Sequence, residues 1–397
     1  MTSFAAPLRI AAVLGGGAVA MWVALGVTMD FTIARKTPAV SQRLWPAGVT
    51  GRVAEGRDFL AGNPTRAQVL AGRERVRDAA LREPVNTHAL SILAAFDDYL
   101  GDKRMARTLF TLAERQSRRN VLAQLWLIED AVARNDVPRA IRHYDRTMRV
   151  SVEMRDTLLP ILVSAGNNPE IRNALAATLR GRPLWWKDYM RQLAAKGEDG
   201  ALLAASLAAT RPDLDDVQER VLAENVLRRM VTLGHGGDAA RLANRIEGQS
   251  GAPPLLKDGG FETGGGLLPF AWQLNEEGSL RAYRDAVPGG EGLRIDVAGD
   301  TSATAAQQLL ALAPGRYALT GRTGNIAEDR LSRPTIQLSC ADGKSLARFA
   351  LPAAADSGTR FRFAFDVPGS CAVQWMAIVA TATNDADIWI DDLAITR

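Results

Sequence analysis

The spacing of apolar residues changes near residue 255 of this chain. Upstream, alanine, leucine and arginine recur with the period of an α-helix. Downstream, apolar and polar residues alternate, as in "RFRFAF" (360–365), which places three phenylalanines on one face of a strand. A chain of 397 residues is also too long for one ordinary core. We therefore predict a helical part followed by a separate all-β part, joined near residue 250.

An internal repeat supports the helical prediction. The stretch that starts at Ala89 matches the stretch that starts at Ala123 with a constant offset of 34 residues. The matched pairs include Gly101 with Asn135, Ala106 with Ala140, and Phe110 with Tyr144. Each unit predicts a helix, a tight turn and a second helix, because glycine and asparagine tolerate left-handed backbone angles.

This pattern resembles the tetratricopeptide repeat, whose turn, alanine and aromatic positions correspond to Gly101, Ala106 and Phe110. The match covers residues 84–148 and weakens beyond them. The resemblance implies a stack of helical hairpins with a groove that binds protein partners. Trp185 and Trp186 are candidate residues of that groove, and the alternative is that the adjacent pair splits, with one ring in the core and the other half-exposed.

The C-terminal part predicts an antiparallel β-sandwich. Short apolar runs are separated by segments with turn chemistry, such as "ADGK" and "DVPGS". The motifs "DGGFE" (258–262), "GEGLRIDV" and "DIWIDDLAI" resemble, in order, those of jelly-roll carbohydrate-binding modules. The resemblance covers residues 255–395. The resemblance implies a jelly-roll fold. Because members of the family bind sugars, it also implies glycan binding.

A sugar-binding module needs exposed aromatic rings that stack on pyranose faces. The candidate glycan-binding residues are Trp389, Trp272, Trp375 and Tyr283. Trp389 is the best candidate for an exposed ring, because its neighbours Ile388 and Ile390 face the other way on a strand. The alternative for each ring is a place in the core.

The resemblance also implies a structural Ca²⁺, because in that family the opening glutamate and the closing aspartate often share one. Carried over to this chain, the metal ligands would be Glu262 and Asp392, together with Asp258. Oxygen ligands from the two ends of the domain would close the sandwich. The alternative is a metal-free closure by hydrogen bonds, and no other cofactor is expected.

The two cysteines of the chain, Cys340 and Cys371, both lie on predicted strands of the C-terminal part. In an oxidising compartment, neighbouring strands would let them form a disulfide. Two buried free thiols are the alternative.

The N-terminal residues 10–29 carry no charge, which predicts a single transmembrane helix. A cleaved secretory signal is the alternative, but the apolar stretch is long for one and lacks a clear cleavage site. We expect an inner-membrane protein with its bulk on the extracytoplasmic side. The flanking charges favour the opposite orientation, because more arginine and lysine follow the stretch than precede it.

The fold class expected is therefore multidomain, with a transmembrane helix, an α-hairpin solenoid and a β-sandwich. The predicted limits are a tail and transmembrane helix at 1–36, a linker at 37–52, the helical repeat at 53–248, a linker at 249–256 and the sandwich at 257–397.

No catalytic constellation emerges from the sequence. The three histidines show no metal-ligand spacing, and phosphate-cradling, nucleophile-elbow and zinc-protease motifs are absent from the sequence. The net charge of +4 comes without a nucleic-acid recognition motif, so we expect no nucleic-acid partner. We predict a non-enzymatic, membrane-anchored scaffold of the bacterial envelope, with a role in polysaccharide assembly or export. The alternatives are a protein-assembly scaffold whose sandwich binds nothing, and a carbohydrate-active enzyme without a recognisable motif.

Overall fold

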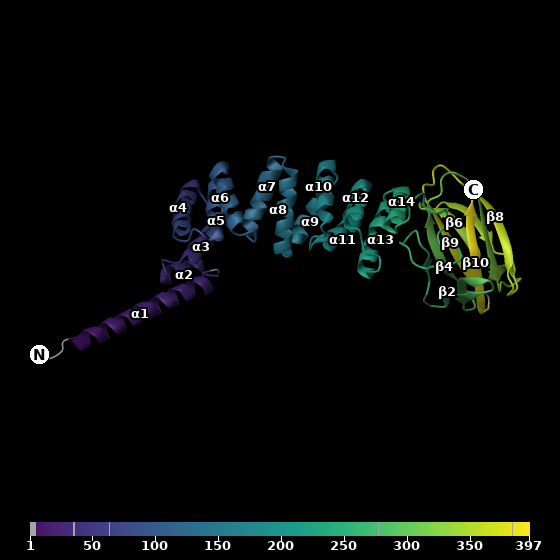
Figure 1. The fold of residues 1–397 in the computed structure, drawn as a ribbon, viewed down its shortest axis with the longest axis horizontal. Helices are drawn as coiled ribbons and strands as arrows, with labels where there is room; N and C mark the ends of the chain where they lie inside the picture. The colour runs from purple at the N-terminus through teal and green to yellow at the C-terminus, as the bar shows by residue number, and fades with distance from the viewer. Residues whose placement is uncertain (1–4, 35, 63, 277, 383) are drawn as a thin grey trace. The chain divides into compact units, whose positions relative to one another are not determined.

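The computed structural model describes residues 5–34, 36–62, 64–276, 278–382 and 384–397, with side chains from residue 16 onward (Figure 1). Its contacts divide the chain into two compact units, Met1–Arg155 and Asp156–Arg397. The first unit is helical. The second contains further helices and the β-sandwich.

The first unit consists of paired helices. The elements are α1 (Ala5–Thr32), α2 (Pro38–Leu44), α3 (Val49–Ala61), α4 (Arg66–Arg82), α5 (Thr87–Tyr99), α6 (Lys103–Gln116), α7 (Val121–Ala133) and α8 (Val137–Val150), followed by the start of α9 (Glu153–Ala165).

Helix caps explain why the hairpins repeat. The Asn86 side chain accepts the Ala89 N–H at the start of α5, and Asp102 accepts the Met105 N–H at the start of α6, at 3.1 and 2.9 Å. Asn120 and Asp136, each 34 residues further on, cap α7 and α8 in the same way. An N-cap of this kind contributes about 1 kcal/mol. The sequence repeat is thus a repeat of helix starts.

The turns and cores of the two predicted units also agree with the sequence. Gly101 and Asn135 both have left-handed backbone angles, with φ of 91° and 55°. Ala106 and Phe110 are buried between α5, α6 and their neighbours, as are their counterparts in α8. The helical hairpins are therefore confirmed, and the assignment to the tetratricopeptide family stays a prediction.

Helix α1 contains the stretch that predicted a transmembrane helix at 10–29. Within the described part of the chain, no helix combines the length and the apolar character that a membrane span requires. The transmembrane prediction, and the inner-membrane location that depended on it, are wrong. The side chains of residues 10–15 of that stretch lie outside the described residues.

The end of α1 packs on protein. The Trp22 and Trp45 rings lie 4.6 Å apart. The Asp30 carboxylate accepts the backbone N–H groups of Thr50 and Gly51, both at 3.0 Å, at the start of α3. Apolar length alone did not reveal these contacts, because the partner residues lie in the following helices.

The second unit continues with helices and then changes to strands. The helices are α10 (Pro169–Leu179), α11 (Trp186–Lys196), α12 (Gly200–Thr210), α13 (Val217–Thr232) and α14 (Gly236–Ile246). The strands are β1 (Gln273–Leu274), β2 (Leu280–Val287), β3 (Gly290–Val297), β4 (Thr301–Leu310), β5 (Gly315–Gly324), β6 (Thr335–Cys340), β7 (Ser345–Ala350), β8 (Thr359–Val367), β9 (Gln374–Ala382) and β10 (Ala386–Thr396), with a short 3₁₀ helix η1 (Arg330–Ser332) before β6.

The strands form two antiparallel five-stranded sheets. Sheet 1 has the order β1-β4-β9-β6-β7, and sheet 2 has the order β2-β3-β10-β5-β8. Their inner faces share one apolar core. Phe361, Phe363 and Phe365 of β8 all face this core, as the strict alternation predicts. The multidomain combination of helices and an antiparallel β-sandwich is confirmed.

The predicted domain limits stay a prediction. The structure changes from helix to strand between Ile246 and Gln273, but the division into compact units falls at residue 155, inside the predicted helical domain.

Candidate functional site

The four aromatic residues proposed for glycan binding lie in different environments. Trp272 is buried, packs on Phe261 with ring centroids 5.0 Å apart, and donates its indole N–H to the Asp258 carbonyl at 3.0 Å. Tyr283 is half-buried on the outer face of sheet 2, where its hydroxyl donates to Asp296 at 3.3 Å. Trp375 is half-buried on the outer face of sheet 1.

Trp389, the best candidate for an exposed ring, is 0% exposed, so it is not a glycan-stacking residue and the alternative of a packed ring holds. Trp389 does face away from the core, but two glycines from other segments cover it. A Cβ placed on Gly324 would lie 2.2 Å from its indole nitrogen, and one on Gly358 would lie 2.5 Å from its ring. The Arg322 guanidinium stacks on the same ring at 5.5 Å.

The registers of sheet 1 bring polar side chains from four of its strands into one row, which crosses the fifth strand, β9, at Ala377. Gln273 pairs with Gln307, and Gln307 pairs with Ala377. Ala377 also pairs with Gln337, which pairs with Arg348 on the edge strand β7. Residues paired across a sheet share a face, and strands are about 4.8 Å apart, so the row is about 19 Å long. We call Gln273, Gln307, Gln337 and Arg348 the amide row.

The amide row lies on the outer face of sheet 1. Met376 and Ile378, on either side of Ala377, are buried in the core, so Ala377 and its cross-strand partners point outward. Trp375 precedes Ala377 by two residues and therefore lies on the same face, between Leu309 and Ser339. Around the row this face presents small and hydroxyl side chains, among them Ser302, Thr304, Ser345, Val379 and Thr381.

The two outer faces of the sandwich differ in charge. Arg348 is the one charged side chain that we find among the described, paired positions on the outer face of sheet 1. The outer face of sheet 2 carries rows of charged residues. These rows are Arg281–Asp296–Asp387 and Asp391–Arg322–Arg360.

The chemistry of the amide row suits hydroxyl groups. Each glutamine amide offers donors and an acceptor to a ligand. Gln307 donates to Gln273 at 3.1 Å, and Gln337 donates to the Thr335 hydroxyl at 3.2 Å, which orients both amides. An indole beside them offers an apolar surface to the flat face of a sugar ring. The combination can bind an uncharged, polyhydroxylated ligand, and it contains no acid/base pair.

The sequence contained part of this signal. Alternation along β6 and β9 places Gln337, Ser339 and Trp375 on outward positions of their own strands. It does not say that β6 lies beside β9 or that β1 lies beside β4, because these pairings skip along the chain.

The predicted calcium ligands do not converge. Asp258 accepts hydrogen bonds from the Thr263 N–H and hydroxyl and from the Gly264 N–H, and it faces Arg284 at 3.4 Å. Asp392 faces Arg322 instead, at 3.6 Å. Within the described residues, no group of three or more His, Cys, Asp or Glu side chains is arranged to hold a metal ion. The set Glu262, Asp392 and Asp258 therefore does not fit a shared calcium ion.

Asp391, rather than Asp392, is the buried carboxylate at this end of β10. Burial raises the pKa of Asp391, and the nearby charges of Asp392 and Glu262 raise it further, against the lowering effect of Arg322. Its Oδ1 accepts the Asp392 N–H at 2.6 Å.

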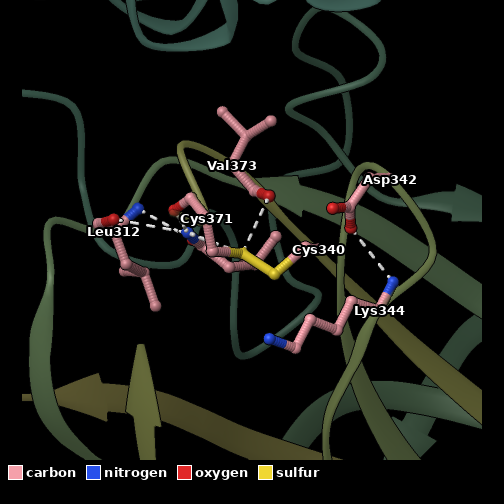
Figure 2. The surroundings of a disulfide bond; sticks show 7 residues. Leu312, Cys340, Asp342, Lys344, Cys371 and Val373 are labelled. Carbon is pink, nitrogen blue, oxygen red and sulfur yellow. Dashed lines mark hydrogen bonds between the residues drawn. A yellow bond between two sulfur atoms is a disulfide. The ribbon is translucent and has the colours of Figure 1, made fainter. Parts of the chain in front are cut away.

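Cys340 and Cys371, which are 31 positions apart in sequence, form a disulfide with Cα atoms 5.5 Å apart (Figure 2). The bond joins the end of β6 to the loop before β9. Gln374 holds the same loop, since its amide donates to the Cys371 carbonyl at 2.8 Å and accepts the Leu312 N–H at 3.0 Å. Of the two alternatives for the cysteines, the disulfide is confirmed.

Trp185 and Trp186 are both buried, so they do not line an open groove. Trp185 packs edge-on against Tyr189 at 6.1 Å, and Trp186 lies under the Arg182 guanidinium at 4.7 Å. Their proposed role as partner-groove residues is wrong for this reason. Both rings belong to the packing of α11.

A separate hollow of about 460 Å³ lies at one end of the sandwich, between the segments 325–332 and 382–388. Asn325 and Asn384 contribute to it, and its described lining holds no aromatic ring. Asp385 nearby is engaged with the Gly299 N–H at 2.9 Å. The hollow lacks the stacking surface that the outer face of sheet 1 offers.

The fold and this face define a β-sandwich domain that resembles carbohydrate-binding modules. Solved structures with a similar fold include TmCBM61 in complex with β-1,4-galactotriose, at 15% identity and a TM-score of 0.28, covering 36% of this chain and 98% of that one. A family 16 carbohydrate-binding module matches at 19% identity and a TM-score of 0.26, covering 36% of this chain and 99% of the module.

A tailspike protein of bacteriophage CBA120 matches at 11% identity and a TM-score of 0.28, and the match spans 36% of this chain but only 21% of the tailspike. No protein-family model matches the chain. No curated protein matches it either. Similarity at this level does not transfer a ligand or an activity, so the candidate site depends on the residues of this chain.

Proposed function

We propose that the sandwich binds an uncharged glycan chain across the outer face of sheet 1. The observation that carries this proposal is the amide row beside Trp375 on a face that is nearly free of charge. A solvated face that binds nothing is expected to resemble the outer face of sheet 2, with alternating arginine and aspartate. Glutamine and hydroxyl side chains, in contrast, match the hydrogen-bonding groups of sugars without paying to desolvate a charge.

The test is glycan binding by the full chain, first on an array and then by calorimetry with the strongest ligand. Trp375→Ala and Gln337→Ala should each weaken binding about tenfold or more, which corresponds to about 1.4 kcal/mol. Tyr283→Ala is the matched control, because Tyr283 is a half-buried aromatic residue on the outer face of the other sheet. Equal effects of all three substitutions, or an array without a ligand, would contradict the proposal.

In this proposal the protein is a non-enzymatic adaptor, and the helical part holds protein partners. Exposed apolar side chains on the helices and in their turns, such as Leu81, Val85 and Val132, support a protein-binding role. The disulfide supports an oxidising, extracytoplasmic compartment. A role in envelope polysaccharide assembly fits both glycan binding by the sandwich and protein binding by the helices. Turnover of the bound glycan would instead favour a carbohydrate-active enzyme.

A scaffold whose sandwich binds no ligand is the second candidate. This candidate needs only the exposed apolar side chains of the helical part, which do not depend on a sugar ligand. Pull-down with the full chain and with Trp375→Ala separates the two: a protein partner retained by both, together with a silent array, supports the scaffold.

A further inference from the structure

The last two helices and the sandwich meet at two places within the second compact unit. The first place is a short segment after three consecutive glycines. Residues 264–266 all have left-handed backbone angles, with φ of 58°, 78° and 92°, which glycine alone adopts without strain. The chain then enters Leu267–Ala271, a segment in which Leu267, Phe270 and Ala271 are buried. We call residues 267–271 the wedge.

Two glutamates from different helices hold the wedge. Glu247, just after α14, accepts the Leu267 N–H at 2.8 Å, and Glu224 of α13 accepts the Leu268 N–H at 3.2 Å. Glu247 also forms an ion pair with Lys257. Both carboxylates are buried or nearly so, and charge-assisted hydrogen bonds in such surroundings are among the stronger ones. In a flexible linker, the N–H groups of Leu267 and Leu268 would form hydrogen bonds with water instead.

The second place is the loop that carries the disulfide. Gly236 begins α14, and a Cβ placed there would lie 2.5 Å from Cγ1 of Val373. Val373 is buried and lies two residues after Cys371. The two segments therefore touch so closely that only glycine fits at position 236. We call this contact the Val373 seat.

The disulfide braces the Val373 seat. The Val373 carbonyl accepts the N–H of Ala341, the residue after Cys340, at 3.2 Å. Cys371 itself is bonded to Cys340 and accepts from Gln374. The loop that reaches α14 is thus tied to β6 and β9 at its base. Without the bond, the loop 368–373 would gain conformational freedom at the point of contact.

We propose that the sandwich is docked on α13 and α14 in one fixed orientation through the wedge and the Val373 seat, and that the Cys340–Cys371 disulfide braces the second of these contacts. The predicted linker at 249–256 is then part of a packed junction. Its residues Pro253, Pro254 and Leu255 line a small hollow together with Ala240 of α14 and Phe270 of the wedge. The sandwich acts as the terminal cap of the helical stack.

The experiment is hydrogen exchange of the full chain, followed by mass spectrometry. Gly236→Leu retains both cysteines but introduces a side chain into the Val373 seat. We expect amide exchange in the first turns of α14 and in residues 371–375 to rise about tenfold or more, while β10 stays protected. Gly237→Leu is the matched control, because the atom nearest to a Cβ at Gly237 is the end of the Arg241 side chain, 3.8 Å away.

Two further double variants separate the effect of the disulfide on the Val373 seat from the effect of the glutamates on the wedge. Cys340→Ala with Cys371→Ala should raise exchange at the Val373 seat and leave the wedge amides protected. Glu224→Gln with Glu247→Gln should raise exchange at Leu267 and Leu268 and leave the disulfide loop protected. If exchange also rises in β10 of the cysteine variant, the sandwich itself has unfolded. The Gly236→Leu variant, which keeps the disulfide, then tests the Val373 seat. Exchange that is the same in Gly236→Leu, Gly237→Leu and the unmodified chain would overturn the proposal.

Discussion

The Arg107 guanidinium of α6 spans both oxygens of the Asp130 carboxylate on α7. Its Nε lies 2.9 Å from Oδ2, and its Nη2 lies 2.5 Å from Oδ1. The pair joins one hairpin to the next, and Asp130 is buried. One hairpin earlier, Arg73 contacts a single oxygen of Asp97, from Nε to Oδ1 at 2.5 Å. Hydrogen bonds from Arg107 keep the pKa of Asp130 below its usual range despite burial.

Asp130→Asn should destabilise the helical unit by about 2 kcal/mol, since a buried charge-assisted pair is replaced by a poorer contact that leaves Arg107 without its charge partner. Chemical denaturation measures the change. Asp58→Asn is the control, because Asp58 pairs with Arg57 at an exposed position where such pairs contribute little. If both substitutions have the same effect, the buried pair does not stabilise the stack.

His143 should make the stability of α7 and α8 depend on pH. Burial, followed by the charges of Arg146, Arg139 and Arg142, lowers the pKa of His143 to about 4. The neutral ring donates its Nδ1–H to Gln124 at 2.6 Å. In the unfolded chain the pKa returns to about 6.5, so between these values only the unfolded state takes up the proton. Stability is therefore complete above about pH 6.5 and falls as the pH decreases towards 4.

The loss across that window is about 3 kcal/mol, from about 1.4 kcal/mol for each pKa unit. Hydrogen exchange of α7 and α8 at several pH values reports it after correction for intrinsic rates. His143→Gln keeps a polar partner for Gln124 and should flatten the dependence between pH 6.5 and 4. An unchanged slope in this variant would assign the dependence to other groups.

Gly324→Ala should destabilise the sandwich by about 1–3 kcal/mol, because the new methyl group would overlap the Trp389 ring. Thermal unfolding measures the shift, which is roughly 2–4 °C for each kcal/mol in a domain of this size. Gly369→Ala is the control, since no atom lies within 4 Å of a Cβ at that position. If Gly324→Ala melts like the control, Trp389 is not packed as described.

Calcium should leave the melting temperature of the sandwich unchanged. Two of the three predicted ligands face different arginines, Asp258 facing Arg284 and Asp392 facing Arg322, so the charges are already compensated within the protein. The measurement compares the full chain in calcium and in chelator. A rise in melting temperature with calcium would show that the carboxylates rearrange around the ion.

Local sequence patterns predicted which segments form helical hairpins and which form strands. The offset between Asn86 and Asn120 marks two helix caps, and the alternation from Phe361 to Phe365 marks one buried face of β8. Both signals are local, because an N-cap acts within one turn and a strand alternates by itself.

The candidate face of sheet 1 and the burial of Trp389 both depend on contacts between residues that are distant in sequence. Gln273 and Arg348 belong to one row only because β4, β9 and β6 lie between their strands. Trp389 is covered by Gly324 and Gly358, which alternation along β10 does not reveal. The stretch at 10–29 misled for a different reason: freedom from charge does not by itself give the apolar character of a membrane span, and no helix of the described residues reaches it.

The position of β10 has a consequence for biosynthesis. This last strand lies in the middle of sheet 2, hydrogen-bonded to β3 on one side and β5 on the other. The helical hairpins use neighbours in sequence and can form while the chain is still being translated. The sandwich must wait until its final residues leave the ribosome, so a premature stop before residue 386 would remove the centre of a sheet and not merely its edge.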